Sequence, residues 1–244
     1  MLDAAKKFIK ATPLLRPLIA VKGLITRPRA QNDEAAILAD LVARHAVPQR
    51  FVEFGFSGWE FNCADLARTW DGLLIDGDRY NVTIASTILP RRVVARHEWL
   101  TLDTLDVIST YLAGRELGVL SIDVDGNDYW FLEALIGLRP AIIISEYNSV
   151  FGHRSISVPY DPAFDRRQFG DGWYFGASLA ALAGLAAPHG YVLVAETGGI
   201  NAFFLRDDLL TAADRPMTAA QAYRPRHADK WAEIAHLPFV DVAS

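Results

Sequence analysis

Acidic side chains follow two apolar segments of this sequence at a spacing that allows them to act together. Asp123 and Asp125 come directly after the run 119–122, and Glu146 follows the run 141–145. If both runs are neighbouring strands, the three carboxylates lie close together and repel one another unless they bind a cation or share a proton. A divalent metal is the simpler solution.

The elements that position these carboxylates alternate between strand and helix. Helices are expected after Asn32 and over 59–70, 129–136 and 177–187, and short apolar runs predict strands at 50–54, 73–75, 92–95, 119–122 and 141–145. This alternation is typical of an α/β protein with a mainly parallel sheet and helices on both faces. Ligands of such sheets bind at the carboxyl ends of the strands, where the acidic residues fall.

The end of the sheet separates two classes of α/β protein. The runs 191–195 and 202–205 are joined through Gly198 and Gly199, which predicts an antiparallel hairpin. Five parallel strands finished by such a hairpin give the seven-stranded sheet of the Rossmann-like class I methyltransferase fold. The alternative, a Rossmann-fold NAD-dependent sugar oxidoreductase or epimerase, continues with parallel units, and the sequence contains no Tyr-x-x-x-Lys dyad.

A glycine-rich turn follows the first predicted strand. The segment 51–60, FVEFGFSGWE, resembles motif I of methyltransferases that use S-adenosylmethionine (SAM). Glycines let the backbone approach a ligand and leave the first amides of a following helix free to bind it. The resemblance implies that Gly55, Ser57 and Gly58 contact the methionine part of SAM, and that Glu53 meets its ammonium group or orders the loop.

The second predicted strand ends in Asp76, and Asp78 lies two residues further along. A carboxylate in this place can accept both ribose hydroxyls of an adenosine. Asp76 is preferred because it directly ends the run 73–75, with Asp78 as its competitor. The structural alternative is an aspartate that caps the next helix.

The segments 120–130, LSIDVDGNDYW, and 144–148, ISEYN, carry a more specific resemblance. They are similar to metal-dependent sugar O-methyltransferases of the macrocin O-methyltransferase type and to FkbM-type methyltransferases. The first group implies that Asp123, at the cofactor, ligates Mg²⁺, that Asp125 is the general base and that Glu146 is a second metal ligand.

Alternatives remain open for these roles. The FkbM pattern puts a carboxylate at Ser145, so Asn148 is a candidate oxygen ligand in its place, with weak or absent metal affinity as the consequence. Asp125 could instead ligate the metal while Asp128 serves as the base. The structural interpretation is an Asx-rich turn over 123–128 that caps the next helix.

The connection after the fifth strand is longer than usual and contains candidate substrate contacts. Its arginines, Arg166 and Arg167, suit the phosphates of a nucleotide- or lipid-linked sugar, because guanidinium groups bind phosphate bidentately. The segment 149–172 is therefore predicted to be a lid over the acceptor. His153 is a candidate substrate contact or auxiliary base.

Composition limits the partners and the compartment. The chain has 244 residues, a formal net charge of −5 and a single cysteine, Cys63. This balance argues against nucleic acid as a partner, and a lone cysteine fits the cytoplasm. The predicted parts are a basic arm at 1–30, a methyltransferase domain at 31–210 and a polar, helical tail at 211–244.

The basic arm carries seven Lys or Arg residues and one acidic residue, Asp3. It is expected to pack on the domain or on a second subunit of a homo-oligomer. Peripheral docking on an anionic inner membrane face is the alternative.

These features predict a SAM-dependent O-methyltransferase whose acceptor is a sugar hydroxyl of a glycan, glycolipid or glycosylated metabolite. A sugar hydroxyl ionises too weakly to attack unaided, so the reaction needs a base, a metal ion or both. A non-catalytic methyltransferase-like binding subunit is a further alternative, against which the set Asp123, Asp125 and Glu146 argues.

Overall fold

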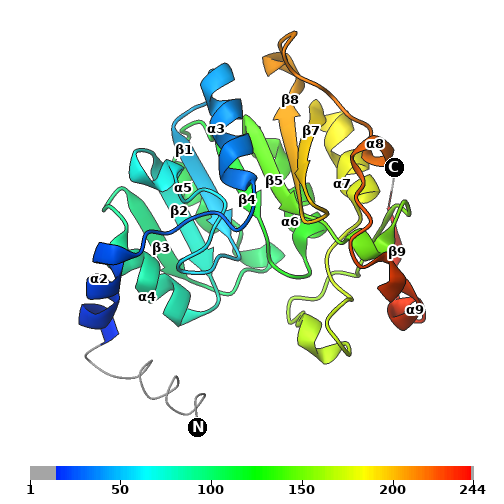
Figure 1. Cartoon of the computed structure of the whole chain (residues 1–244), viewed down its shortest axis with the longest axis horizontal. Coiled ribbons are helices and arrows are strands. Elements are labelled where there is room, and N and C mark those ends of the chain that lie inside the picture. Colours follow the sequence, from blue (N-terminus) through cyan, green and yellow to red (C-terminus); the bar gives the residue numbers. More distant parts are fainter. Residues whose placement is uncertain (1–14, 243–244) are drawn as a thin grey trace.

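The computed structural model describes residues 15–242 and contains one seven-stranded sheet in the order β3, β2, β1, β4, β5, β8, β7 (Figure 1). Every strand predicted above is present, with ends that differ by at most two residues. The strands are β1 Arg50–Phe54, β2 Asp71–Asp76, β3 Val93–His97, β4 Val119–Ile122, β5 Ile142–Glu146, β7 Tyr191–Thr197 and β8 Asn201–Arg206.

The direction of β8 defines the class of fold. β8 runs antiparallel to β5 and to β7, whereas the other neighbouring strands of this sheet are parallel. In the dinucleotide-binding order 3-2-1-4-5-6, the strand beyond the fifth stays parallel. The chain therefore has the Rossmann-like fold of class I methyltransferases, and the predicted fold class is confirmed.

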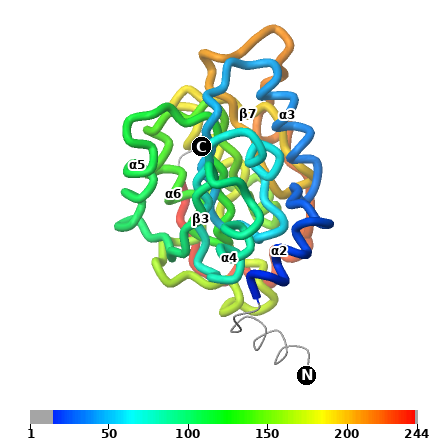
Figure 2. The backbone as a smooth tube through the Cα atoms, turned by 90° about the vertical axis from the view of Figure 1, so that its left-hand side faces the viewer, coloured from blue at the N-terminus to red at the C-terminus, as the bar shows by residue number. Residues whose placement is uncertain are grey.

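Helices cover both faces of the sheet. Successive residues of a strand point to opposite faces of the sheet. Phe51 and Leu74 pack against the layer of α3 and α4, while Val52 and Leu73 pack against the layer of α5, α6 and α7. Figure 2 shows α3 on one side of the sheet and α5 and α6 on the other. The bounds are α3 Glu34–Arg44, α4 Arg79–Ile88, α5 Asp106–Leu112, α6 Asp128–Leu135 and α7 Leu179–Ala186.

The prediction of a helix over 59–70 is wrong. This segment consists of turns and one 3-10 helix, Leu66–Arg68, and its backbone is bound elsewhere. The N–H of Phe61 donates to the carbonyl of Arg29, and the N–H of Arg29 donates to the carbonyl of Trp59. These contacts hold the segment in an open turn, so no helix N-terminus follows the glycines.

The C-terminal tail is mostly irregular, not helical as expected. Its α-helices are α8 Ala219–Ala222 and α9 Trp231–Ile234, with a 3-10 helix at Ala228–Lys230 before α9 and the strand β9 Val240–Asp241 after it. Pro216, Pro225 and Pro238 interrupt the tail, and proline cannot continue a helix.

The tail packs against the connection that was predicted to be a lid. β9 pairs with β6 (Ile156–Ser157), and the two segments share a small hydrophobic core. In this core Phe151 and Tyr174 contact Phe239. The connection is therefore held by tertiary packing along much of its length.

α2, Leu15–Ile25, contains most of the described part of the predicted basic arm, whose first fourteen residues lie outside the described residues. Its buried residues Leu15 and Ile19 pack with Ile84 of α4 and with Trp59. The prediction that the arm packs on the domain thus holds for this helix. Among residues 15–242, no helix is long and apolar enough to cross a membrane.

Gly55 determines how closely β1 and β4 approach at their ends. Its φ is +77°, and a Cβ at this position would overlap the carbonyl oxygen of Asp123. We expect Gly55→Ala to lower the free energy of unfolding by at least about 3 kcal/mol, because both the strained φ and the overlap must be relieved.

Gly137 is the matched control, since a Cβ there meets nothing within 4 Å. Gly137→Ala should change the free energy of unfolding by no more than about 0.5 kcal/mol. Urea denaturation of both variants checks the prediction, and equal stabilities would contradict it.

Candidate functional site

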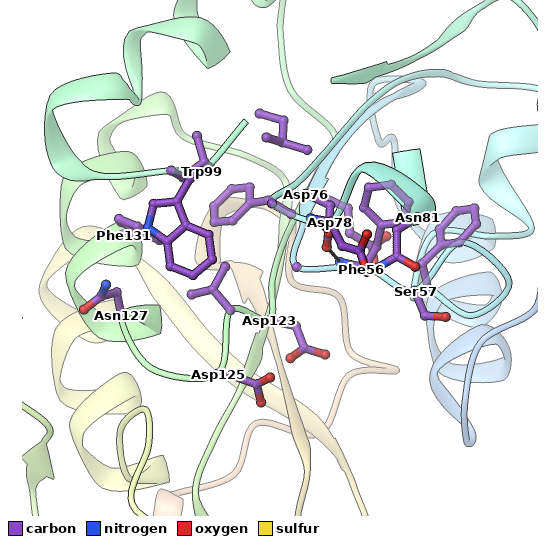
Figure 3. A pocket seen from close by; sticks show the side chains of 18 of the residues that line it. Phe56, Ser57, Asp76, Asp78, Asn81, Trp99, Asp123, Asp125, Asn127 and Phe131 are labelled. Atoms are coloured by element: carbon purple, nitrogen blue, oxygen red, sulfur yellow. Dashed lines mark hydrogen bonds between the residues drawn. The ribbon is translucent and has the colours of Figure 1, made fainter. Parts of the chain in front are cut away.

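A cavity of about 660 Å³ lies at the carboxyl edge of β1, β2 and β4 (Figure 3). Its volume suits a small-molecule ligand or cofactor. Trp99 and Phe131 lie on one side of it, and the turn after β1 lies on the other. Its polar lining includes Ser57, Asn62, Asp76, Asp78, Asn81, Asp123, Asp125 and Asn127.

Glu53 lines this cavity but is only 1% exposed. Its two carboxylate oxygens accept the backbone N–H groups of Asn62, at 2.7 Å, and Cys63, at 2.8 Å. Burial raises the pKa of Glu53 to about 7, against the effect of these hydrogen bonds. Of the two roles expected for Glu53, the structure shows the ordering of the loop.

Asp76 and Asp78 both line the cavity at the end of β2. Asp76 accepts the N–H groups of Phe56, at 3.1 Å, and Asp78, at 2.6 Å, so it ties the turn after β1 to the turn after β2. Burial raises the pKa of Asp76. Asp78 is the N-cap of α4 and accepts the N–H of Tyr80 at 2.7 Å, which is the capping role weighed above.

The glycine turn contributes to the site unequally. Ser57 lines the cavity and exchanges backbone hydrogen bonds with Glu60. Gly58 does not line the cavity. A Cβ at Gly58 would lie 2.6 Å from the side chain of Ile84, and the N–H of Gly58 donates to the side-chain oxygen of Asn81. Gly58 therefore allows the turn to pack on α4.

Trp99, which the sequence analysis missed, forms a wall of the cavity after β3. Its ring lies against Gly77, where a Cβ would be 2.6 Å away, and the side chain is 60% exposed. Its indole Nε1 donates to the carbonyl of Pro162 at 2.7 Å. A tryptophan shortly after the third predicted strand was the signal available in the sequence, but its contact with the distant connection was not readable there.

The three acidic residues do converge. Ligand oxygens of Asp123, Asp125 and Glu146 lie within 4.8 Å of one another. Burial, with Asp128 and Asp125 nearby, raises the pKa of Asp123 well above its ordinary value. Burial and then Asp123 do the same for the pKa of Glu146, whose buried Oε2 has no hydrogen-bond partner among the described residues.

Asp125 is the most accessible member of this cluster. Its φ is +57°, a conformation that few residues other than glycine adopt. Its carboxylate forms an ion pair with Arg166, whose guanidinium lies 4.3 Å from the ring centre of Phe175. The predicted lid arginine therefore binds the predicted base in this structure. Arg167 also lines the cavity and pairs with Asp165.

Asp128 and Asn148 have structural contacts. Asp128 is fully buried and accepts the N–H groups of Val124, at 2.9 Å, and Gly126, at 3.0 Å. Burial raises its pKa to about 6. These contacts make Asp128 the group that holds the 123–128 turn, as in the structural interpretation, rather than a base that faces the cavity.

Asn148 caps the 3-10 helix Ser149–Phe151 through its side-chain oxygen, which accepts the N–H of Val150 at 3.0 Å. Its amide nitrogen donates to the carbonyls of Trp173 and Phe175. The oxygen proposed as a metal ligand is thus engaged with the backbone. His153 lies against Tyr223 with 4.6 Å between ring centres, and it does not line the cavity.

Comparisons with known proteins find little similarity to this chain in sequence. No protein-family model matches the chain, and no curated protein matches it. Solved structures that resemble it include the N-terminal domain of EvdMO1 with S-adenosylhomocysteine (SAH) bound. That domain is 15% identical, with a TM-score of 0.45 over 72% of this chain and 80% of that chain.

The structure of EvdMO1 itself is 16% identical, with a TM-score of 0.45 over 80% of this chain and 49% of that chain. A putative O-methyltransferase from Klebsiella pneumoniae is 17% identical, with a TM-score of 0.42 over 82% of this chain and 93% of that chain. The interpretation of the site below therefore depends on its own geometry.

The raised pKa of the buried Glu53 should make the free energy of unfolding depend on pH. Its pKa is about 7 in the folded chain against an ordinary value of 4.5, so the folded state holds the proton more tightly than the unfolded state. Its contribution is full below about pH 4.5 and is lost as the pH rises through 7. Relative to Glu53→Gln, which does not titrate, the wild type should lose at most about 3 kcal/mol over this range.

Denaturant unfolding of both proteins between these pH values measures the difference. Glu133→Gln, at an exposed position of α6, is the control and should give a profile parallel to the wild type. A parallel profile for Glu53→Gln as well would contradict the prediction.

Proposed function

We propose that this protein is a SAM-dependent O-methyltransferase that acts on a sugar hydroxyl. The observation that carries the proposal is the position of the acidic cluster: Asp123 and Asp125 form a wall of a cofactor-sized cavity at the carboxyl edge of a methyltransferase sheet. A bound donor and an ionisable acceptor would meet at this wall.

The cavity has the features that SAM requires. Gly55 opens the turn after β1, and Asp76 offers a carboxylate at the end of β2 for a ribose. Trp99 and Phe131 provide aromatic surface for an adenine ring. The antiparallel β8 favours this cofactor over NAD, because dinucleotide-binding sheets continue in parallel.

The cluster also fits a divalent cation. Its ligand atoms are carboxylate oxygens, which Mg²⁺ and Mn²⁺ prefer, and the buried Oε2 of Glu146 lacks a partner within residues 15–242. Asp123 and Glu146 would hold the ion. When bound, Mg²⁺ stabilises an acceptor alkoxide, and SAM supplies an electrophilic methyl group.

The residues of the chain perform the remaining steps. Asp125 would accept the proton of the acceptor hydroxyl, whose oxygen would receive the methyl group that SAM supplies, with S-adenosylhomocysteine as the leaving product. Arg166 holds the Asp125 carboxylate in place before the acceptor arrives. No covalent enzyme intermediate is needed, because alignment alone contributes up to roughly 7–11 kcal/mol.

Calorimetry and methyl transfer test the proposal together. S-adenosylhomocysteine should bind in the micromolar range, about −8 kcal/mol, and NAD should not. Asp125→Asn should preserve this binding but slow methyl transfer from labelled SAM to a sugar panel by about 10²–10⁴-fold, the contribution of a positioned base. EDTA should abolish transfer, and Mg²⁺ or Mn²⁺ should restore it.

Asp106→Asn, at an exposed position of α5, is the matched control and should keep full activity. Binding of NAD without S-adenosylhomocysteine would overturn the assignment. Full activity in EDTA, with no metal in the purified protein, would reject the metal and leave a metal-free base mechanism.

A further inference from the structure

A second cavity, of about 290 Å³, lies beside the first. Residues after β5, the turn between β7 and β8 and the C-terminal tail enclose it. Arg166 and Gln31 line both cavities, whereas Glu146 lines the second and Asp123 and Asp125 line the first. The acidic cluster therefore stands between the two cavities.

One arginine of the second cavity has no carboxylate partner within the described residues. Arg226 and His227 line it together with Arg166. Among residues 15–242, Arg226 forms no ion pair with a carboxylate, although nearby Arg224 pairs with Glu196 at 3.3 Å. The Nε–H of Arg226 donates to Nε2 of His227 at 3.4 Å. An unpaired guanidinium at a cavity wall favours an anionic ligand.

The same cavity offers a surface for a sugar ring. Trp173 lines it, with 4.6 Å between the centres of its indole and the His227 imidazole. The buried Nε1–H of Trp173 has no acceptor in the described part of the chain. A buried donor without a partner is costly, and a hydroxyl oxygen of a bound ligand would satisfy it.

From this geometry we infer that the second cavity binds the acceptor and that the acceptor is an anionic sugar, one with a carboxylate or a phosphate group. Arg226 takes the anionic group, Trp173 contacts the ring, and the reacting hydroxyl lies at Glu146 beside the cluster. The inference rests on the proposed function, since it assigns the substrate class of that site. The residues involved come from the connection and the tail, not from the methyltransferase sheet.

Calorimetry of the full chain with glucuronate, glucose 1-phosphate and glucose, each with and without S-adenosylhomocysteine, tests the inference. At least one anionic sugar should bind about tenfold or more tightly than neutral glucose, and the two anions distinguish a carboxylate from a phosphate. Arg226→Gln should remove this preference and leave S-adenosylhomocysteine binding unchanged. Arg215→Gln, in the same tail but outside the cavity, should behave as the wild type.

Equal binding of the three sugars, no binding of either anion, or an anion preference that survives Arg226→Gln would overturn the inference. These outcomes leave the proposed function standing if S-adenosylhomocysteine still binds. Failure of S-adenosylhomocysteine to bind would contradict the proposed function. The preference for an anionic sugar and its dependence on Arg226 are measured also without S-adenosylhomocysteine, so the two results can be told apart.

A different observation concerns the surface of α2. Its face away from α4 carries Leu18, Val21, Leu24 and Ile25, which are 57%, 63%, 85% and 86% exposed. These are the most exposed large apolar side chains of residues 15–242 apart from Trp99, and exposed apolar surface of this kind marks an interaction site. Helical spacing places them on one side.

The charges around this face indicate its partner. Between residues 15 and 30 the chain carries four basic residues, Arg16, Lys22, Arg27 and Arg29, and no acidic residue. An apolar helix face with basic neighbours binds anionic lipid surfaces. α2 also contacts the segment that directly follows the glycine turn, because Lys22 lies 4.4 Å from the ring centre of Trp59. We propose that α2 docks this edge of the domain on an anionic lipid surface.

Co-sedimentation with vesicles tests this second proposal. The full chain should bind vesicles of phosphatidylcholine and phosphatidylserine and not vesicles of phosphatidylcholine alone. Leu24→Glu with Ile25→Glu should abolish binding, while Leu102→Glu, at a 39% exposed leucine elsewhere, should not.

Equal sedimentation of the α2 double variant and the wild type would overturn the proposal, as would no binding to either vesicle. A concentration-dependent dimer that the double variant disrupts, in the absence of vesicle binding, would assign the face to a second copy of the chain instead.

Discussion

The crowding of buried carboxyl groups at the ends of β1, β4 and β5 is the constraint around which the site is organised. Glu53 and Asp128 are each compensated by two backbone N–H groups, and the loops after β1 and β4 take their shapes from those hydrogen bonds. Asp123 and Glu146 face each other, and burial raises the pKa of both. The loops after β1 and β4 thus compensate one carboxyl group each, whereas Asp123 and Glu146, at the ends of β4 and β5, lie where a ligand can reach them.

This division explains why neighbouring acidic residues have different roles. Asp123, Asp125 and Asp128 lie within one short turn, yet their settings differ. Asp123 is partly buried at the cavity wall, Asp125 is accessible and paired with Arg166, and Asp128 holds the turn from inside. The positive φ of Asp125 follows from the same turn, which Asp128 closes by accepting the N–H of Gly126. A strained position at a cavity wall is typical of functional sites.

Segments outside the parallel core complete the walls. Trp99 joins the loop after β3 to Pro162, and Arg166 joins the same connection to Asp125. At the other end of the sheet, Glu34 of α3 accepts hydrogen bonds from Thr197 and Asn201, so α3 anchors the hairpin that brings Asn201 to the cavity. The chemistry proposed here requires alignment more than reactive groups, and these links between distant segments supply rigidity.

The sequence by itself determined the strands, the antiparallel hairpin and the convergence of Asp123, Asp125 and Glu146, because apolar periodicity and strand order depend on local patterns and on general rules of sheet topology. Tertiary structure alone decided which carboxylates accept hydrogen bonds from backbone N–H groups. The segment 59–70 has the composition of a helix, but Glu53 and Arg29 bind its backbone instead. Asp128 was a candidate base and Asn148 a candidate metal ligand, and their partners are backbone groups that the folded loops bring to them. Arg226 and Trp173 reach the second cavity only because the tail packs on the connection after β5, a contact between segments dozens of residues apart that no local pattern encodes.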